Sequence, residues 1–291
     1  MREYNEELLH RVQQLELGIL KDFVHVCEEN HLTWWAFWGT GIGALRHGGF
    51  IPWDDDIDVC LPRKDYDRLL AVLARDYADR YEIVNGDTYE TYPLATTRVM
   101  LRDSRFVEGP LKDIKCPLGI FLDVYAFDHV APDPKAAKRQ MWKTWIHSKF
   151  LILRFIPRPV LPVRGAAAVL LHLATAAVHG CLKLFRVSPR KIYRRMIAAT
   201  TKYNDQPAAA YGYFADTAPD KSIFRFEDLF PLRKIPFEDM ELNFPSHLEE
   251  MLTVAYGDYM QLPPVEKRRN HFPYILKFPG DPQVYRADDE V

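Results

Sequence analysis

The residues with the clearest potential for chemistry form an acidic run, IPWDDDIDVCLP, which contains Asp54, Asp55, Asp56 and Asp58. Asp56 and Asp58 are separated by one apolar residue, and side chains two apart on a strand face the same side. Neighbouring carboxylates repel each other, and a bound divalent cation relieves that repulsion. Mg²⁺ suits such oxygen ligands, with Mn²⁺ as an alternative, and it usually completes its shell with water and substrate phosphates. The run therefore predicts a metal site for phosphate chemistry.

The same run has a simpler interpretation, because most short acidic clusters are solvated loops or helix caps. Here Phe50, Pro52 and Trp53 flank the carboxylates, and the run leads into an apolar strand. A surface loop rarely places aromatic rings beside so many acids. The sequence therefore favours a functional site over a solvated loop.

A third carboxylate is expected near this pair, and Asp123 is the best candidate. It is the single acid in the apolar stretch Ile120–Ala126, which is typical of a buried strand. A buried carboxylate is costly unless it is paired or bound to a metal. Asp123 could be a further metal ligand or the base that takes a proton from an acceptor, and the sequence leaves both open. Asp128, just past this strand, is expected to be a turn or cap residue.

Gly39 and Thr40 lie upstream of the acidic run, between an expected strand and an expected helix. A glycine turn before a helix presents backbone N–H groups and a hydroxyl, which together can bind a phosphate. Positive charge around this turn is expected from four nearby residues, Arg46, His47, Arg63 and Lys64.

Hydrophobic periodicity predicts the elements that position these groups. Helices are expected over residues 5–29, Ile42–Arg46, Lys64–Ala78, much of 135–200 and Ser246–Tyr256. Strands are expected at Thr33–Trp38, Asp56–Cys60, Tyr81–Val84, Thr97–Leu101 and Ile120–Ala126. The middle helical region is interrupted by Pro157, Pro159 and Pro162. Helices mixed with strands in this order predict an α/β or α+β core.

The composition, with 48% hydrophobic and 27% charged residues, is that of a globular protein rather than a disordered chain. The four cysteines lie far apart without a CxxC pair, which argues against a zinc site and against a disulfide framework. The charged N-terminal segment lacks the apolar core of a signal peptide. A cytoplasmic protein is expected.

The small net charge conceals a basic middle segment. Residues 134–204 hold 15 of the 38 Lys and Arg residues and no acid. Within them, Lys149–Arg186 combines apolar stretches with Arg154, Arg158 and Arg164. Anionic lipids attract such residues, so we predict an element that docks on a membrane surface. A helical hairpin packed on the catalytic core remains an alternative, and a spanning helix is less favoured because His and Lys interrupt the run.

The string GTGIGALRHGGFIPWDDDIDVCLPRKDY, Gly39 to Tyr66, resembles the signature of the LicD family, which is related to the fukutin group. GIFLDVYAFD resembles the family's strand that carries a third aspartate, and Tyr256–Arg268 is similar to its C-terminal box. The resemblance covers most of the chain and is weakest over residues 135–245. One departure is Gly41-Ile42-Gly43, where the family often has two leucines before the second glycine.

This resemblance implies a fold like that of polymerase-β-type nucleotidyltransferases: an α+β core with a mixed sheet, plus a largely helical basic middle segment. Residues 1–133 would form the catalytic core, 134–204 the basic helical segment, and 205–291 the part that completes the domain. The implied partners are CDP-choline or another CDP-alcohol, a glycan acceptor that is lipid-linked, and the inner membrane surface, with no nucleic acid. The protein would then be peripheral at the cytoplasmic face.

The implied reaction is Mg²⁺-dependent transfer of phosphocholine, or a similar phospho-alcohol, to a hydroxyl of lipopolysaccharide, teichoic acid or a lipid-linked precursor. By position in the motifs, Asp56 and Asp58 are the metal pair, Asp123 the third carboxylate and Asp54 a further metal ligand. The substrate-binding residues would be Gly39, Thr40, Arg46, Arg63, Lys267 and Arg268. For Lys267 and Arg268, an exposed basic pair without a substrate contact remains equally open.

Two other functions remain open at this point. The metal site would serve equally well in an enzyme that transfers the nucleotidyl group itself. A catalytically inactive, membrane-associated scaffold is disfavoured, because every expected aspartate is present.

Overall fold

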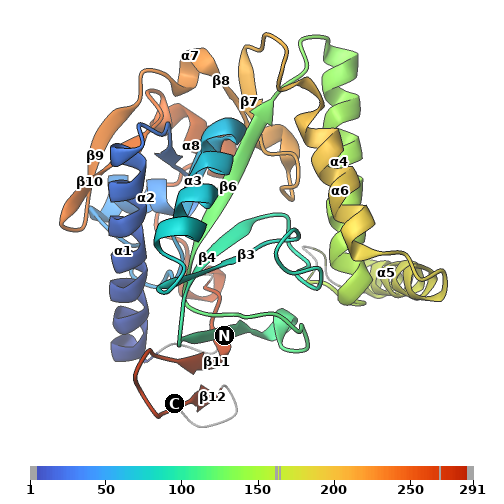
Figure 1. Cartoon of the computed structure of the whole chain (residues 1–291), viewed down its shortest axis with the longest axis horizontal. Coiled ribbons are helices and arrows are strands. Elements are labelled where there is room, and N and C mark those ends of the chain that lie inside the picture. Colours follow the sequence, from blue (N-terminus) through green and yellow to red (C-terminus); the bar gives the residue numbers. More distant parts are fainter. Residues whose placement is uncertain (1–4, 161–162, 164, 269, 287–291) are drawn as a thin grey trace.

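The computed structural model describes residues 5–160, 163, 165–268 and 270–286. Its centre is a mixed sheet in the order β1-β2-β6-β4-β3, and β7 is also paired to β6 (Figure 1). The bounds are β1 (Trp35–Ala36), β2 (Asp58–Pro62), β3 (Tyr81–Val84), β4 (Thr97–Leu101), β6 (Phe121–His129) and β7 (Ala210–Gly212). β2 and β6 run parallel, whereas β4 is antiparallel to β6. The predicted α+β fold class is confirmed.

Apolar side chains fix the two central strands and so position the acids between them. β2 is buried along its whole length, and Ile57 and Val59 on either side of Asp58 are fully buried. Two amphipathic helices, α1 (Glu6–Glu29) and α3 (Arg63–Asp76), pack on the sheet and contact β6. Asn5 caps α1 by accepting a hydrogen bond from the Glu7 N–H.

Helix α2 (Trp38–His47) follows β1 and ends at Gly48, which adopts the left-handed conformation that favours glycine. Gly43 allows the loop after this helix to fold back closely, because a Cβ there would collide with the carbonyl oxygen of Gly49. The prediction that Gly39-Thr40-Gly41 would break the chain before a helix at Ile42 is wrong. Small residues fit the first turn of α2, where the acidic loop approaches.

Residues 134–200 form three helices beside the sheet. The long α4 (Pro134–Phe155) and α6 (Pro189–Thr200) lie side by side, and α5 (Ala166–Leu184) projects from their end, away from the sheet (Figure 1). Leu151, Ile192, Tyr193 and Met196 form a separate small core between α4 and α6. Within the described residues, α5 alone is long and apolar enough to cross a membrane, by length and composition only. Pro157 and Pro159 lie between α4 and α5, whereas Pro162 and Arg164 lie outside the described residues.

The C-terminal third returns to the sheet and to its surroundings. Its strands are β8 (Ile223–Arg225), paired to β7, the hairpin β9 (Arg233–Phe237) and β10 (Met240–Phe244), and β11 (Pro273–Lys277), paired to β12 (Tyr285–Arg286) and to β5 (Arg105–Glu108). Its helices are α7 (Phe226–Leu229) and α8 (Leu248–Tyr256). Short 3₁₀ turns occupy Gly109–Leu111, Thr201–Tyr203, Pro219–Ser222 and Val265–Lys267. α8 packs on α2 and thereby brings the C-terminal third to the acidic loop.

Most expected elements form near their predicted positions, but three strands have other bounds. The strand predicted at Thr33–Trp38 is only Trp35–Ala36, because Trp38 begins α2. The strands Tyr81–Val84 and Thr97–Leu101 have the predicted bounds. β2 begins at Asp58 rather than Asp56, so Asp56 lies in the loop before the strand. β6 extends through Asp128 to His129, which makes the expectation of a turn or cap at Asp128 wrong. Pairing of Asp128 and His129 with β7 continues the strand past the predicted end.

Candidate metal centre and the adjacent cavity

Three carboxylates converge where β2 and β6 begin. Asp58 lies directly opposite Asp123 in the parallel pair, and Asp56 comes from the loop before β2. Asp56, Asp58 and Asp123 each contribute one oxygen, and these oxygens lie within 4.8 Å of one another. Such a set of carboxylate oxygens can surround one hard divalent cation.

The state of these carboxylates fits a cation. Asp58 Oδ1 is buried and has no hydrogen-bond partner, an arrangement that is rare for a buried oxygen unless an ion or water satisfies it. Burial, and then Asp56 and Asp123, raise the pKa of Asp58 well above its ordinary value. Burial also raises the pKa of Asp123, to about 6, although Arg98 opposes the rise. A positive charge among them would favour their ionised forms.

Two cationic side chains support this cluster, and sequence reasoning missed both. Arg98 on β4 pairs with Asp123 across the sheet: its Nε lies 3.2 Å from Asp123 Oδ1, and its Nη1 lies 2.5 Å from Glu108 Oε2. His271 Nδ1 lies 3.4 Å from Asp56 Oδ2. Burial lowers the pKa of His271, but Asp56 and Asp55 outweigh burial and raise it well above its ordinary value.

The sequence could have indicated the role of Arg98. It is a lone cation in the apolar strand Thr97–Leu101, and such a cation needs a buried partner just as Asp123 does. His271 carried none, since it lies more than 200 residues from the acidic run, and its backbone N–H donates to Asp55 Oδ1 at 2.7 Å. Only the folded chain reveals that contact.

The start of α2 supports the acidic loop. Thr40 is buried, and its Oγ1 accepts a hydrogen bond of 2.9 Å from the backbone N–H of Asp58. A Cβ at Gly39 would lie 3.0 Å from Asp54 Oδ2, so glycine gives this carboxylate room. These two residues therefore position the acids, and a phosphate contact at Gly39 or Thr40 stays a prediction.

A cavity of about 580 Å³ opens in front of the carboxylates. Its wall combines acids, bases and aromatic rings. The acids include Asp54, Asp56 and Asp58, the bases are Arg46, Lys267 and Arg268, and the rings are Trp38, Trp53, Tyr125, Tyr213, Tyr256 and Tyr259. Gly39 also lines the cavity. The fold thus gathers most of the predicted site residues around one space, with Asp123 and Thr40 buried next to it.

The basic side chains of this wall crowd one another. Arg268 lies over the Trp53 ring at 4.2 Å, and Arg46 lies 5.9 Å from the same ring. Burial and the nearby Arg268 lower the pKa of Arg46. Mutual repulsion of this kind is relieved by an anion, so this part of the wall suits a phosphate group.

Arg63 is not brought to this cavity. Its Nε and Nη2 each donate to one oxygen of Asp128 at 3.0 Å, towards the other end of β6. Asp128 also accepts hydrogen bonds of 2.7 Å from Thr200 Oγ1 and from Asn204 Nδ2. The structure therefore gives Arg63 a structural partner, away from the three carboxylates.

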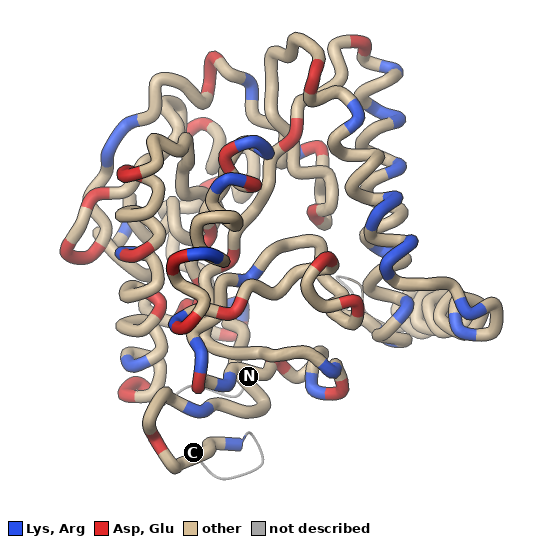
Figure 2. The backbone as a smooth tube through the Cα atoms, in the orientation of Figure 1, with Lys and Arg blue, Asp and Glu red and all other residues tan. Residues whose placement is uncertain are grey.

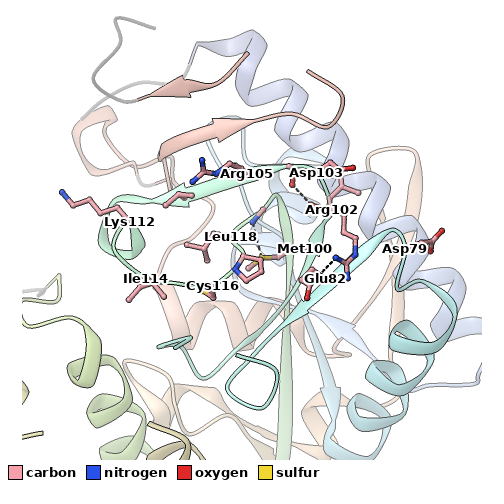
Figure 3. A pocket seen from close by; sticks show the side chains of 15 residues that line it. Asp79, Glu82, Met100, Arg102, Asp103, Arg105, Lys112, Ile114, Cys116 and Leu118 are labelled. Atoms are coloured by element: carbon pink, nitrogen blue, oxygen red, sulfur yellow. Dashed lines mark hydrogen bonds and ion pairs between the residues drawn. The ribbon is translucent and has the colours of Figure 1, made fainter. Parts of the chain in front are cut away.

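A second cavity, of about 370 Å³, lies among β3, β4, β5 and the segment that follows (Figure 3). Glu82 and Arg102 form an ion pair of 2.5 Å in its wall. Asp79, Asp103, Arg105 and Lys112 complete the charged lining, and none of the three clustered aspartates reaches it. Its charges are already paired or exposed, so the candidate metal centre lies beside the larger cavity.

Comparisons with known proteins identify the family of this chain. Residues 31–150 match the family model described as LicD/FKTN/FKRP, nucleotidyltransferase domain. The lipopolysaccharide cholinephosphotransferase LicD of Haemophilus influenzae is 31% identical over 274 residues, which are 91% of this chain and 97% of that protein. Shorter matches occur to uncharacterised proteins of Rickettsia prowazekii, 36% identical over 55 residues (19% of this chain, 21% of that protein), and of Rickettsia typhi, 31% over 71 residues (24% and 23%). The chain belongs to the LicD family, and its sheet with the acidic loop is a nucleotidyltransferase-like domain.

Proposed function

We propose that this protein transfers phosphocholine from CDP-choline to a hydroxyl of a lipopolysaccharide-type glycan or its lipid-linked precursor, with Mg²⁺ as the cofactor. The observation that carries the proposal is the cluster of Asp56, Asp58 and Asp123 in the wall of a cavity that also holds basic and aromatic side chains. The name of the Haemophilus relative, which covers nearly the whole chain, supports the choice of choline and of lipopolysaccharide.

Asp56, Asp58 and Asp123 would hold the cation, with Asp54 beside them. Bound there, Mg²⁺ supplies charge neutralisation to the donor phosphates. Mn²⁺ offers the same oxygen-ligand chemistry. Arg46, Lys267 and Arg268 supply further positive charge to the diphosphate. Arg98 holds Asp123 in place from behind the site.

In the reaction, the oxygen of the acceptor hydroxyl attacks the phosphorus that bears choline, and the bond from this phosphorus to the CMP oxygen breaks. The hydroxyl proton passes to a carboxylate, and CMP leaves. Asp123 is the candidate for this base, unless its main role is to bind the metal ion. Asp123→Asn separates the two roles: a slow enzyme that still binds CDP-choline by calorimetry makes Asp123 the base, whereas loss of binding makes it a ligand.

An aromatic cluster beside Asp58 suits the trimethylammonium group. The ring centroids of Trp38 and Tyr125 lie 4.6 Å apart, and those of Tyr125 and Tyr213 lie 5.0 Å apart with the rings nearly perpendicular. All three rings line the cavity. Ring faces attract quaternary ammonium groups, so we propose that these rings select choline.

Donor competition tests this assignment. Tyr213→Leu should raise KM for CDP-choline by about thirtyfold, since a cation–π contact with a desolvated cation contributes about 2 kcal/mol. It should change KM for CDP-ethanolamine less, because the primary ammonium group of that donor also forms hydrogen bonds with water. Tyr211→Leu is the matched control, because the Tyr211 ring stacks on Trp35, and Tyr211 is not part of the cavity wall. An equal rise in KM for both donors would show that these rings do not select choline.

The product identifies the group that is transferred. Incubation of the purified protein with CDP-choline, Mg²⁺ and a lipopolysaccharide acceptor should release CMP and add the mass of phosphocholine to the acceptor. An acceptor that instead carries CMP would show nucleotidyl transfer. Failure to bind Mg²⁺ together with any CDP-alcohol would leave an inactive scaffold.

Because the acceptor is lipid-linked in this proposal, the reaction would take place at the cytoplasmic face of the inner membrane.

A further inference from the structure

Helix α5 differs from the other long helices of the described chain, because none of its residues, all of which are described, is buried. One face contacts α4: His179 Nδ1 lies 2.7 Å from the carbonyl oxygen of Leu153, and Leu182 packs on the small core between α4 and α6. The alternative of a hairpin buried on the catalytic core is therefore wrong for α5. The rest of the helix surface faces away from the protein.

That outward surface is apolar, contrary to the usual pattern of a surface helix. Val169, Leu170 and Leu173 are 59%, 68% and 61% exposed, and Leu184 at the C-terminal end is 76% exposed. Spacings of three and four residues place them on the side opposite His179 and Leu182. Such a contiguous exposed apolar face marks an interaction surface.

The charge around α5 indicates what covers this face. Residues 134–204 have 15 basic residues and no acid, and Figure 2 shows Lys and Arg along the outer side of α4 and α6. Arg158 precedes α5, whereas Lys183 and Arg186 lie at its C-terminal end, and all three are exposed. An apolar helix face with basic residues at both ends is complementary to a surface of anionic headgroups above acyl chains.

We propose that α5 lies in the plane of an anionic membrane surface, with Val169, Leu170, Leu173 and Leu184 inserted at the acyl boundary. The exposed basic residues of α4 and α6 then bind headgroup phosphates. An in-plane helix keeps its contact with α4 and leaves the catalytic sheet on one side of the bilayer. This inference stands on the surface of α5 and does not depend on the reaction proposed above.

Vesicle flotation of the full-length protein tests the proposal. The protein should float with phosphatidylcholine vesicles that contain phosphatidylglycerol, should stay in the soluble fraction with pure phosphatidylcholine, and should be released by high salt. The double variant Leu170→Glu/Leu173→Glu should reduce recovery in the floated fraction by about tenfold or more, because two charges replace two inserted side chains. Its melting temperature should be unchanged, since neither leucine is buried.

The matched control is Ala71→Glu/Ala74→Glu, which adds the same charge to exposed positions on α3 and should float like the unmodified protein. Equal loss of flotation in both double variants would show that the added negative charge alone prevents binding. That result would overturn the role of α5. Resistance to extraction by alkaline carbonate would instead show a spanning helix. A dimer in size-exclusion chromatography that only the α5 variant dissociates would assign the face to a second copy of the chain.

Discussion

Two buried aspartates of the same strand, Asp123 and Asp128, have opposite surroundings. The carboxylate of Asp128 accepts hydrogen bonds from Arg63, Thr200 and Asn204, and it is 1% exposed. Asp123 shares Arg98 with Glu108 and faces Asp58, whose Oδ1 has no partner. Removal of one partner from a buried ion pair destabilises the fold, whereas a buried oxygen without a partner next to a cavity is typical of a place that an ion or water fills. The difference separates a structural ion pair from a site.

The largest effect is expected from Asp58→Asn, which removes a charge from the cluster of Asp56, Asp58 and Asp123. Transfer should fall by about a thousandfold or more, because charge stabilisation of this kind contributes several kcal/mol. The melting temperature should stay the same or rise, since one of three repelling acids is neutral in the variant. CMP release and thermal unfolding measure the two effects. Unchanged CMP release would remove Asp58 from the site.

Asp128→Ala should give the converse result. It leaves the largely buried Arg63 without its partner, so the free energy of unfolding should fall by about 3–5 kcal/mol in urea titrations. Transfer per folded molecule should remain close to that of the unmodified protein, because Asp128 and Arg63 lie outside the cavity wall. Normal stability combined with lost transfer would instead indicate that Arg63 binds the substrate, as the sequence predicted.

Mg²⁺ itself should distinguish the two aspartates without any substrate. At about one hundred times its dissociation constant, the cation should stabilise the folded protein by about 2.7 kcal/mol. Asp58→Asn should lose this stabilisation by Mg²⁺. Asp128→Asn should be less stable without Mg²⁺ but should gain the same stabilisation when Mg²⁺ is added. Thermal unfolding with and without Mg²⁺ gives both values. An equal increment in both variants would place the cation elsewhere.

Thr40→Val should have the smallest effect. It removes the hydroxyl that accepts the Asp58 N–H and leaves the shape of the side chain, which costs about 1–3 kcal/mol of stability. Transfer should fall only a few-fold, because the carboxylates themselves remain. A loss as large as that of Asp58→Asn would show that Thr40 also contacts a donor phosphate, and kinetics with CDP-choline would reveal it.

The convergence of the three aspartates could be predicted because its signals are local. Asp56 and Asp58 are two residues apart, which is the side-chain period of an extended chain. Asp123 is a lone acid in an apolar strand, and a buried carboxylate needs a partner. The parallel pairing of β2 and β6, which the sequence did not predict, places Asp58 opposite Asp123.

The remaining features depend on contacts between distant segments. Asp128 was expected in a turn because nothing near it in sequence revealed that β7 would pair with its strand or that Arg63 would reach it. Gly39 and Thr40 were expected to bind phosphate, but the local pattern did not show that Asp58 would donate to the Thr40 hydroxyl. His271 was missed for the same reason, whereas Arg98 had a local signal as a lone cation in an apolar strand. Local spacing predicted the candidate ligands, and only the tertiary contacts revealed the side chains that support them.

The contact between His271 and the acidic loop has a consequence for how the protein is made. The backbone N–H of His271 binds Asp55, and the following strand β11 pairs with β5. During synthesis the N-terminal part folds first, and its sheet and three aspartates emerge long before residue 271. The acidic loop therefore gains this support only after His271 and β11 have been synthesised. A chain that stalls or is cut before residue 271 still carries Asp56, Asp58 and Asp123 but lacks the contact that holds their loop, so we expect such a fragment to bind a cation poorly.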